Sequence, residues 1–224
     1  THILNNGVTS YAFKNNILKG GVMEYKTEQE EFWATEFGDN YINRNQNYIS
    51  NISFFSKVIG RAPNIESIIE FGCNIGLNLK ALNTLLPSCH LTGVEINKSA
   101  CKFLNEWGSC DVINESIFNY NEKQKYDLSL VKGILIHINP EMLNNAYKKI
   151  YDSSKKYILI AEYYNPTPVS ISYRGHKDRL FKRDFAGELL DKYSDLKLVD
   201  YGFLYHRDYY FQKDDLTWFL LEKN

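Results

Sequence analysis

The sequence lacks several features that would place a protein in a specialised class. None of its four cysteines forms a C-x-x-C pair, and no histidine-rich segment accompanies them, so no zinc or other metal site is expected. Nothing about the cysteines requires disulfides, which favours a reducing, cytoplasmic location. No apolar run reaches the ~18 residues of a membrane-spanning helix, and the charged-then-apolar layout of a secretory signal is missing. We therefore expect a protein without membrane association.

An excess of charge of one sign is also missing. The 26 basic and 27 acidic residues leave a net charge of −1, so the broad basic field that nucleic acid binding usually requires is not present. The 224 residues, 44% of them hydrophobic, suffice for one α/β domain, which we expect to span residues 23–224. Residues 1–22 are rich in Asn and Gly and contain no acid, and we assign this leader no role.

Helical and strand patterns alternate along most of the chain. A helical arm comes first, with Phe32, Trp33, Phe37 and Tyr41 at helical spacing and a turn expected at Gly38-Asp39. A second helix carries Ile49 to Ile59. Five strands are then predicted at 65–71, 89–96, 109–114, 126–133 and 156–165, with helices at 76–86, 98–107 and 140–154.

The end of the chain has a different pattern. An irregular stretch at 166–180 precedes a helix around 183–192, and two adjacent strand-like runs follow, 196–207 and 214–223, with no helix between them. Strand and helix in alternation are typical of a parallel sheet with right-handed crossovers. The sequence therefore predicts an α/β fold with a seven-stranded, mostly parallel sheet that a C-terminal antiparallel hairpin closes.

The stretch "EFGCNIGLNLKAL", residues 70–82, joins a predicted strand to a predicted helix. A dinucleotide fingerprint would need glycine where Asn74 and Leu77 stand, which disfavours a nicotinamide-dependent oxidoreductase. The pattern acid-x-Gly-x-Asn-x-Gly, from Glu70 to Gly76, matches a methyl-donor loop instead, because Asn tolerates positive φ. Gly72 would let the backbone approach a ligand, and Glu70 would accept from the ammonium of a bound amino acid.

An acidic residue follows the next predicted strand. Glu95, in "GVEIN", lies 19 residues after Gly76, where a carboxylate accepts both ribose hydroxyls of an adenosine. The alternative is a capping residue for the helix at 98–107. Ser116 and Ile117 follow the third strand, where the adenine ring would lie, although either residue is equally compatible with a plain loop.

With this loop and the acidic residue after the second strand, the chain resembles the class I S-adenosylmethionine-dependent methyltransferases. More narrowly, "EFWATEFGDNYINRN", "VKGILIHINPE" and "AEYYNPTPVSISYRGHKDRLFKRDFAGELL" are similar to the pseudaminic acid biosynthesis-associated methyltransferases, over about residues 29–223. The resemblance implies S-adenosylmethionine as the methyl donor, S-adenosylhomocysteine as the product, and a nonulosonic acid sugar or its nucleotide-activated form as a candidate acceptor. A non-catalytic binder of the donor or its product is the alternative.

Further donor contacts are expected on the arm and at the strand ends. Tyr41 and Arg44 come from the arm that often covers the cofactor in methyltransferases, and Arg44 is a candidate partner of the methionyl carboxylate. Its alternative is an ordinary surface arginine. Ile96 and Lys132, at the ends of the second and fourth strands, complete the expected donor contacts.

Methyl transfer needs alignment of donor and acceptor and exclusion of water, with a base only if the acceptor must lose a proton. His137, after the fourth strand, and His176 are the candidate bases; His137 alternatively packs on a helix face. The basic stretch 172–185 is either a solvated surface or a partner for an anionic acceptor. The expected acceptor contacts are Tyr163, Asn165, Tyr173, Arg174, Arg179 and Arg183.

Overall fold

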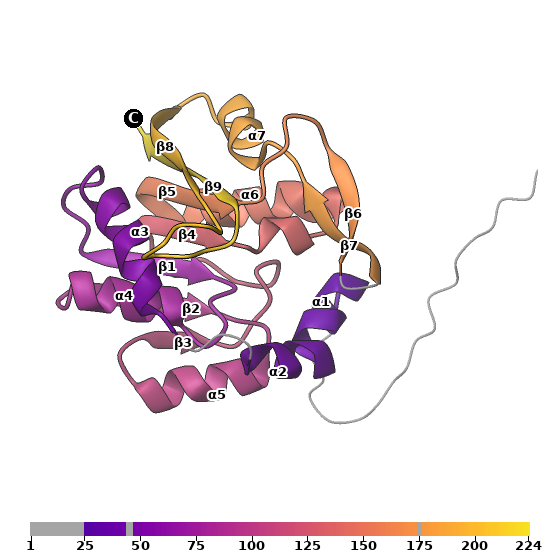
Figure 1. Cartoon of the computed structure of the whole chain (residues 1–224). Coiled ribbons are helices and arrows are strands. Elements are labelled where there is room, and N and C mark those ends of the chain that lie inside the picture. Colours follow the sequence, from indigo (N-terminus) through magenta and orange to yellow (C-terminus); the bar gives the residue numbers. More distant parts are fainter. Residues whose placement is uncertain (1–24, 44–46, 174–175) are drawn as a thin grey trace, which may run out of the picture.

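The centre of the protein is a seven-stranded sheet (Figure 1). The computed structural model describes residues 25–43, 47–173 and 176–224. The strands lie in the order β3 (Asp111–Ile113), β2 (His90–Val94), β1 (Ser67–Phe71), β4 (Tyr126–Lys132), β5 (Ser154–Glu162), β9 (Leu216–Lys223) and β8 (Leu196–Leu204). β1 to β5 pair in parallel, and β9 runs antiparallel to both β5 and β8. The predicted parallel sheet with a C-terminal hairpin is confirmed.

Helices cover both faces of the sheet (Figure 1). In β1, Ile68 packs with α3 (Ile49–Ile59), α4 (Leu77–Leu85) and α5 (Lys98–Trp107), whereas Ile69 packs with α6 (Leu143–Ser153) and α7 (Phe185–Lys192). Successive side chains of a strand point to opposite faces, so an apolar run buried on both sides requires this double cover. Within the described ranges, no helix is long and apolar enough to cross a membrane.

The arm consists of two short helices, α1 (Glu28–Ala34) and α2 (Glu36–Ile42). A capping box between Thr27 and Glu30 starts α1. The turn expected at Gly38-Asp39 was wrong: the helices separate at Thr35, and Gly38 lies buried within α2. A Cβ at Gly38 would lie 1.9 Å from the carbonyl oxygen of Trp33, so this glycine permits the close contact of the two helices.

Two other predicted boundaries were wrong. The stretch at 166–180 is mostly not irregular, because β6 (Val169–Tyr173) and β7 (His176–Lys182) form a separate two-stranded antiparallel sheet. Alternation of Val169 and Ile171 with serines was the strand signal, which the charges that follow obscured. The helix expected from residue 140 begins at Leu143, after the 3-10 turn η2 (Pro140–Met142), since Asn139 caps that turn.

We predict that Gly38→Ala loosens the arm. Alanine favours a helix by about 1 kcal/mol over glycine, so local propensity alone would strengthen α2, whereas the clash with the Trp33 carbonyl opposes it. Hydrogen exchange of the amides in α2 should therefore become faster. Gly60→Ala is the matched control, because its Cβ would make an ordinary 3.4 Å contact with the Ser56 carbonyl. Unchanged or slower exchange in Gly38→Ala would contradict the prediction.

Candidate functional site

A cavity of about 710 Å³ lies at the carboxyl ends of the parallel strands. Its walls come from the loops after β1, β2, β3 and β4, from the arm, and from the connection between β8 and β9. Connections that leave this edge of an open α/β sheet surround the ligand crevice, as expected. The predicted residues that line it are Tyr41, Gly72, Asn74, Glu95, Ile96, Ser116, Ile117, Lys132, His137 and Tyr163.

The loop after β1 adopts the backbone conformation that its sequence requires. Gly72 has φ +67° and Asn74 has φ 49°, so the expected positive φ at Asn74 is confirmed. A Cβ at Gly72 would lie 2.0 Å from the Ile134 side chain, and one at Gly76 would lie 2.4 Å from that of Leu104. Gly76 is the N-cap residue of α4 and is not among the described residues that line the cavity. The structure therefore needs both glycines for its own packing.

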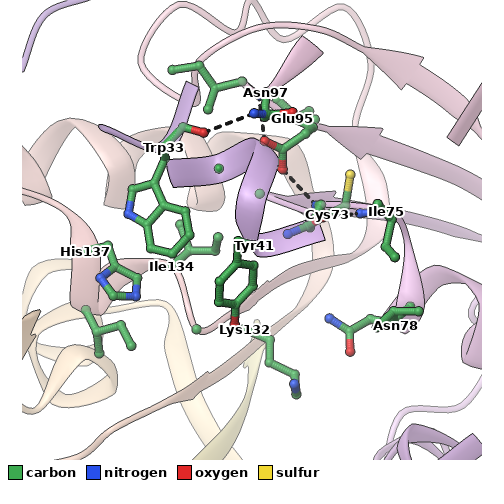
Figure 2. A pocket seen from close by; sticks show the side chains of 18 of the residues that line it. Trp33, Tyr41, Cys73, Ile75, Asn78, Glu95, Asn97, Lys132, Ile134 and His137 are labelled. Carbon is green, nitrogen blue, oxygen red and sulfur yellow. Dashed lines mark hydrogen bonds between the residues drawn. The ribbon is translucent and has the colours of Figure 1, made fainter. Parts of the chain in front are cut away.

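The Glu95 carboxylate joins two loops at the edge of the cavity (Figure 2). One oxygen accepts from the backbone N–H of Asn74 and the other from that of Asn97, both at 2.7 Å. Burial raises the pKa of Glu95, while these N–H donors lower it. The alternative role of Glu95 as a helix cap is wrong, since Asn97 caps α5 through the N–H of Ala100. Glu95 is thus fixed at the cavity with oxygen lone pairs to spare.

Asn97 also holds the arm in place. Its Nδ2 donates to the Trp33 carbonyl at 3.4 Å (Figure 2). The same nitrogen donates to the Asp39 carboxylate at 3.0 Å. A second hydrogen bond to the arm runs from the buried Ser116 hydroxyl to the Glu30 carboxylate. The arm therefore forms part of the cavity wall, next to the loops after β2 and β3.

Aromatic side chains of the arm face the cavity (Figure 2). The Trp33 ring lies 5.3 Å from the Tyr41 ring and 4.7 Å from the His137 imidazole, measured between centroids. His137 ends the 3-10 turn η1 (Leu135–His137). Arg44, the other residue expected on the arm, lies outside the described residues.

Glu70 lies behind the wall of the cavity and does not line it. Its Oε1 accepts from the Asn78 amide at 2.6 Å, and Asn51 in turn donates to Asn78 at 3.0 Å. Its Oε2 has no hydrogen-bond partner among the described residues. Burial raises the pKa of Glu70 to about 7, although the Asn78 bond and the charge of Lys132 lower it. The amides of Asn51 and Asn78 line the cavity in front of this carboxyl group.

A second buried carboxyl group, Glu162, supports the loop that carries His137. Its Oε1 accepts from the backbone N–H groups of Ile134 and Leu135, both at 2.9 Å. Burial raises the pKa of Glu162 to about 7, while these N–H groups lower it. Glu162 was not expected at the site from the sequence, because a carboxylate inside a predicted strand gives no sign that it binds a distant loop.

The segment expected to bind the acceptor is only partly described. Tyr163 lines the cavity, and the Lys182 ammonium lies 5.2 Å from its ring centroid. Asn165 is half-buried and its side chain donates to the Thr167 carbonyl, and Arg183 forms an ion pair with Glu188 of α7. Arg174 and the side chains of Tyr173, His176 and Arg179 lie outside the described residues.

Trp33, Asn97 and Lys213 are among the cavity residues that were not assigned to the site from the sequence. Asn97 was detectable, because an Asn directly before a helix is a common N-cap. Lys213 lies on the connection between β8 and β9, and nothing in the local sequence distinguishes it. In the described part of the chain, no cluster of potential metal ligands occurs.

No protein-family model matches the chain, and no curated protein matches it. Solved structures do. Magnesium protoporphyrin IX methyltransferase from Synechocystis PCC 6803, with bound SAM, matches with a TM-score of 0.63 and 11% identity, over 92% of this chain and 100% of that one. A SAM-dependent methyltransferase from Leishmania major matches with a TM-score of 0.67 and 16% identity, over 87% and 81% of the two chains.

A third structure holds a small-molecule ligand. The 1,6-didemethyltoxoflavin-N1-methyltransferase of Burkholderia thailandensis, with 1,6-didemethyltoxoflavin and S-adenosylhomocysteine bound, matches with a TM-score of 0.62 and 12% identity, over 84% and 82% of the two chains. At these identities the comparisons establish the fold: the chain has the Rossmann-like fold of class I methyltransferases. The narrower resemblance to the pseudaminic acid family is not confirmed by them.

The two buried carboxyl groups predict a pH-dependent stability. Because the pKa values of Glu70 and Glu162 rise from 4.5 to about 7 on folding, the folded state binds more protons than the unfolded chain in this range. Their contribution is therefore full below about pH 4.5 and is lost as the pH rises through 7, by about 3 kcal/mol per group.

The double variant Glu70→Gln/Glu162→Gln, in which each side chain keeps an accepting oxygen, should show a smaller loss of stability between pH 4.5 and 7. Urea unfolding across this range measures it. Glu106→Gln, at an exposed position of α5, is the control and should follow the wild type. If the free energy of unfolding of the double variant fell with pH as steeply as that of the wild type, these groups would not titrate as predicted.

Proposed function

We propose that this protein is an S-adenosylmethionine-dependent methyltransferase. The observation that carries the proposal is the position of Glu95: a carboxylate fixed at the cavity, next to a loop with positive φ at Gly72 and Asn74, in a fold shared with methyltransferases. Several of the matching structures hold the donor or its product S-adenosylhomocysteine. The carboxyl edge of the sheet is where such a fold binds its ligand.

The residues around the cavity fit the donor. Glu95 would accept from the ribose hydroxyls, with Ile96, Ser116 and Ile117 beside the adenine. The amino-acid tail would lie toward Asn78, Lys132 and Tyr41, near the buried Glu70 oxygen that has no partner among the described residues. When bound, the donor supplies a methyl group on a positively charged sulfonium. Residues of this chain would bind and orient it.

The arm would exclude water from the cavity. Trp33 and Tyr41 face the cavity, and the bonds from Asn97 and Ser116 hold their helices against the body of the protein. A closed cavity aligns donor and acceptor and strengthens the electrostatic interactions inside it. The arm is therefore the part of this chain that would separate the reaction from solvent.

His137 is the candidate base for a hydroxyl acceptor. It lines the cavity, and the N–H groups that Glu162 binds fix the turn on which it lies. Proton removal by such a residue is needed for a hydroxyl and not for a carboxylate acceptor. His176 remains a second candidate base, and its side chain lies outside the described residues.

The acceptor that we propose is a small, polar, anionic molecule. The basic stretch 172–185 and the resemblance to the pseudaminic acid biosynthesis-associated methyltransferases support a nonulosonic acid sugar or its nucleotide-activated form. The neighbour from Burkholderia thailandensis binds a small molecule in the same fold. We further propose that residues 23–224 form one domain that acts in the cytoplasm, without nucleic acid as a partner.

Calorimetry with S-adenosylmethionine, S-adenosylhomocysteine and NAD tests the class of ligand. Binding of NAD alone would favour the oxidoreductase alternative, which Asn74 and Leu77 disfavour. Binding of the donor without turnover over a panel of anionic sugars would favour a non-catalytic binder.

We predict that Glu95→Ala lowers the affinity for S-adenosylhomocysteine by about tenfold to a hundredfold. The ribose loses a charged acceptor, worth about 1.5 to 3 kcal/mol. Calorimetry measures the affinity, and thermal unfolding without ligand measures how far the loops at Asn74 and Asn97 depend on the same carboxylate. Glu106→Ala, on the surface of α5, is the control. Equal affinity in Glu95→Ala and the wild type would remove Glu95 from the site.

For a hydroxyl acceptor, we predict that His137→Phe lowers turnover by ~10² to 10⁴. Phenylalanine keeps a ring against Trp33 but cannot take a proton, so S-adenosylhomocysteine affinity should stay within about twofold. Single-turnover kinetics with the first acceptor found in the panel measures the effect. Full turnover in His137→Phe would exclude His137 as the base.

A further inference from the structure

Two lysines that come from distant parts of the chain line the same cavity. Lys132 ends β4, and Lys213 lies on the connection between β8 and β9. Among the described residues, neither ammonium has a carboxylate within ion-pair distance or a hydrogen-bond acceptor, whereas lysines elsewhere, such as Lys149 with Glu122, form such pairs. The labelled Lys132 side chain is drawn among those that line the cavity in Figure 2.

The charges around the two lysines are unbalanced at short range. Burial lowers the pKa of Lys132 despite the more distant Glu70, Asp214 and Glu162, which raise it. Burial and, to a smaller extent, the positive charge of Lys132 lower the pKa of Lys213 to about 8, so the two groups interact. Asp214 alone opposes this shift. Two like charges close together in a cavity repel each other unless an anion lies between them.

Three carboxyl groups act on the lysines from beyond ion-pair distance. Asp214 lines the cavity with them and forms no ion pair with either lysine in the described part of the chain. Glu70 is bound to Asn78, and Glu162 binds the N–H groups of Ile134 and Leu135. Polar groups that suit an anion are present instead, since the side chains of Asn78 and Gln212 line the cavity with the lysines.

We propose that Lys132 and Lys213 together bind an anionic group, a carboxylate or a phosphate, inside the cavity. The proposal rests on the proposed function for the identity of the molecule that carries this group. That molecule is either the donor, through the carboxylate of its amino-acid tail, or the acceptor. Lys213 thereby gives the connection between β8 and β9 a role in ligand recognition, in a cavity that none of the described side chains of 164–185 lines.

The lysines are tested with Lys132→Met and Lys213→Met, which keep most of the apolar stem and remove the charge. Lys102→Met, at an exposed position of α5, is the control for the change in net charge. The probes are S-adenosylhomocysteine, 5′-methylthioadenosine, which lacks the amino-acid tail, and inorganic phosphate, each measured by calorimetry with full-length protein.

If the donor carries the anion, each variant should bind S-adenosylhomocysteine about tenfold more weakly or worse, and 5′-methylthioadenosine within about twofold of the wild type. If the acceptor carries the anion, each variant should bind S-adenosylhomocysteine with the affinity of the wild type, and the same should hold for 5′-methylthioadenosine. Phosphate, with or without saturating S-adenosylhomocysteine, should then bind about tenfold more weakly in each variant, and its affinity for the wild type should fall as the pH rises through about 8.

Unchanged affinities for all three probes, or equal losses of both nucleosides, would overturn the lysine site. Failure of the proposed function looks different. In that case the wild type binds neither nucleoside, while phosphate binding without S-adenosylhomocysteine still shows whether the two lysines hold an anion.

Discussion

The Glu95 carboxylate is the interaction on which the cavity depends. With one oxygen on the N–H of Asn74 and the other on the N–H of Asn97, it fixes the loops after β1 and β2 relative to each other. Asn97 then holds the arm, and the arm brings Trp33 to His137. A carboxylate oriented by two backbone donors needs little rearrangement to accept further hydrogen bonds, which is the condition for a preorganised site.

Much of the fold was predictable because its signals are local. Apolar runs of strand length with proline and glycine boundaries, in alternation with helices, predict the parallel strands. A final pair of strands without a helix between them predicts the antiparallel hairpin. Gly72, Asn74 and Glu95 were predictable for the same reason: a turn between strand and helix restricts both its backbone and the residue at the strand end. All three line the cavity.

The rest of the site depends on contacts between distant segments. Gly38 looks like a helix breaker until the Trp33 carbonyl is seen against it. Glu162 looks like a strand residue, and only its contact with Ile134 and Leu135 shows its role. Lys213 belongs to the cavity because the β8–β9 pair folds back beside β5. Local pattern carries no information on which loops meet at one edge of a sheet.

Few other residues could make all the hydrogen bonds of Asn97. Its side-chain oxygen caps α5, and its side-chain nitrogen donates to both Trp33 and Asp39. Aspartate and serine can cap a helix, but aspartate has no hydrogen to donate, and the shorter serine hydroxyl has only one. Either replacement would keep the cap of α5 and lose at least one hydrogen bond to the arm, so we expect the arm and the loop after β2 to change together in evolution.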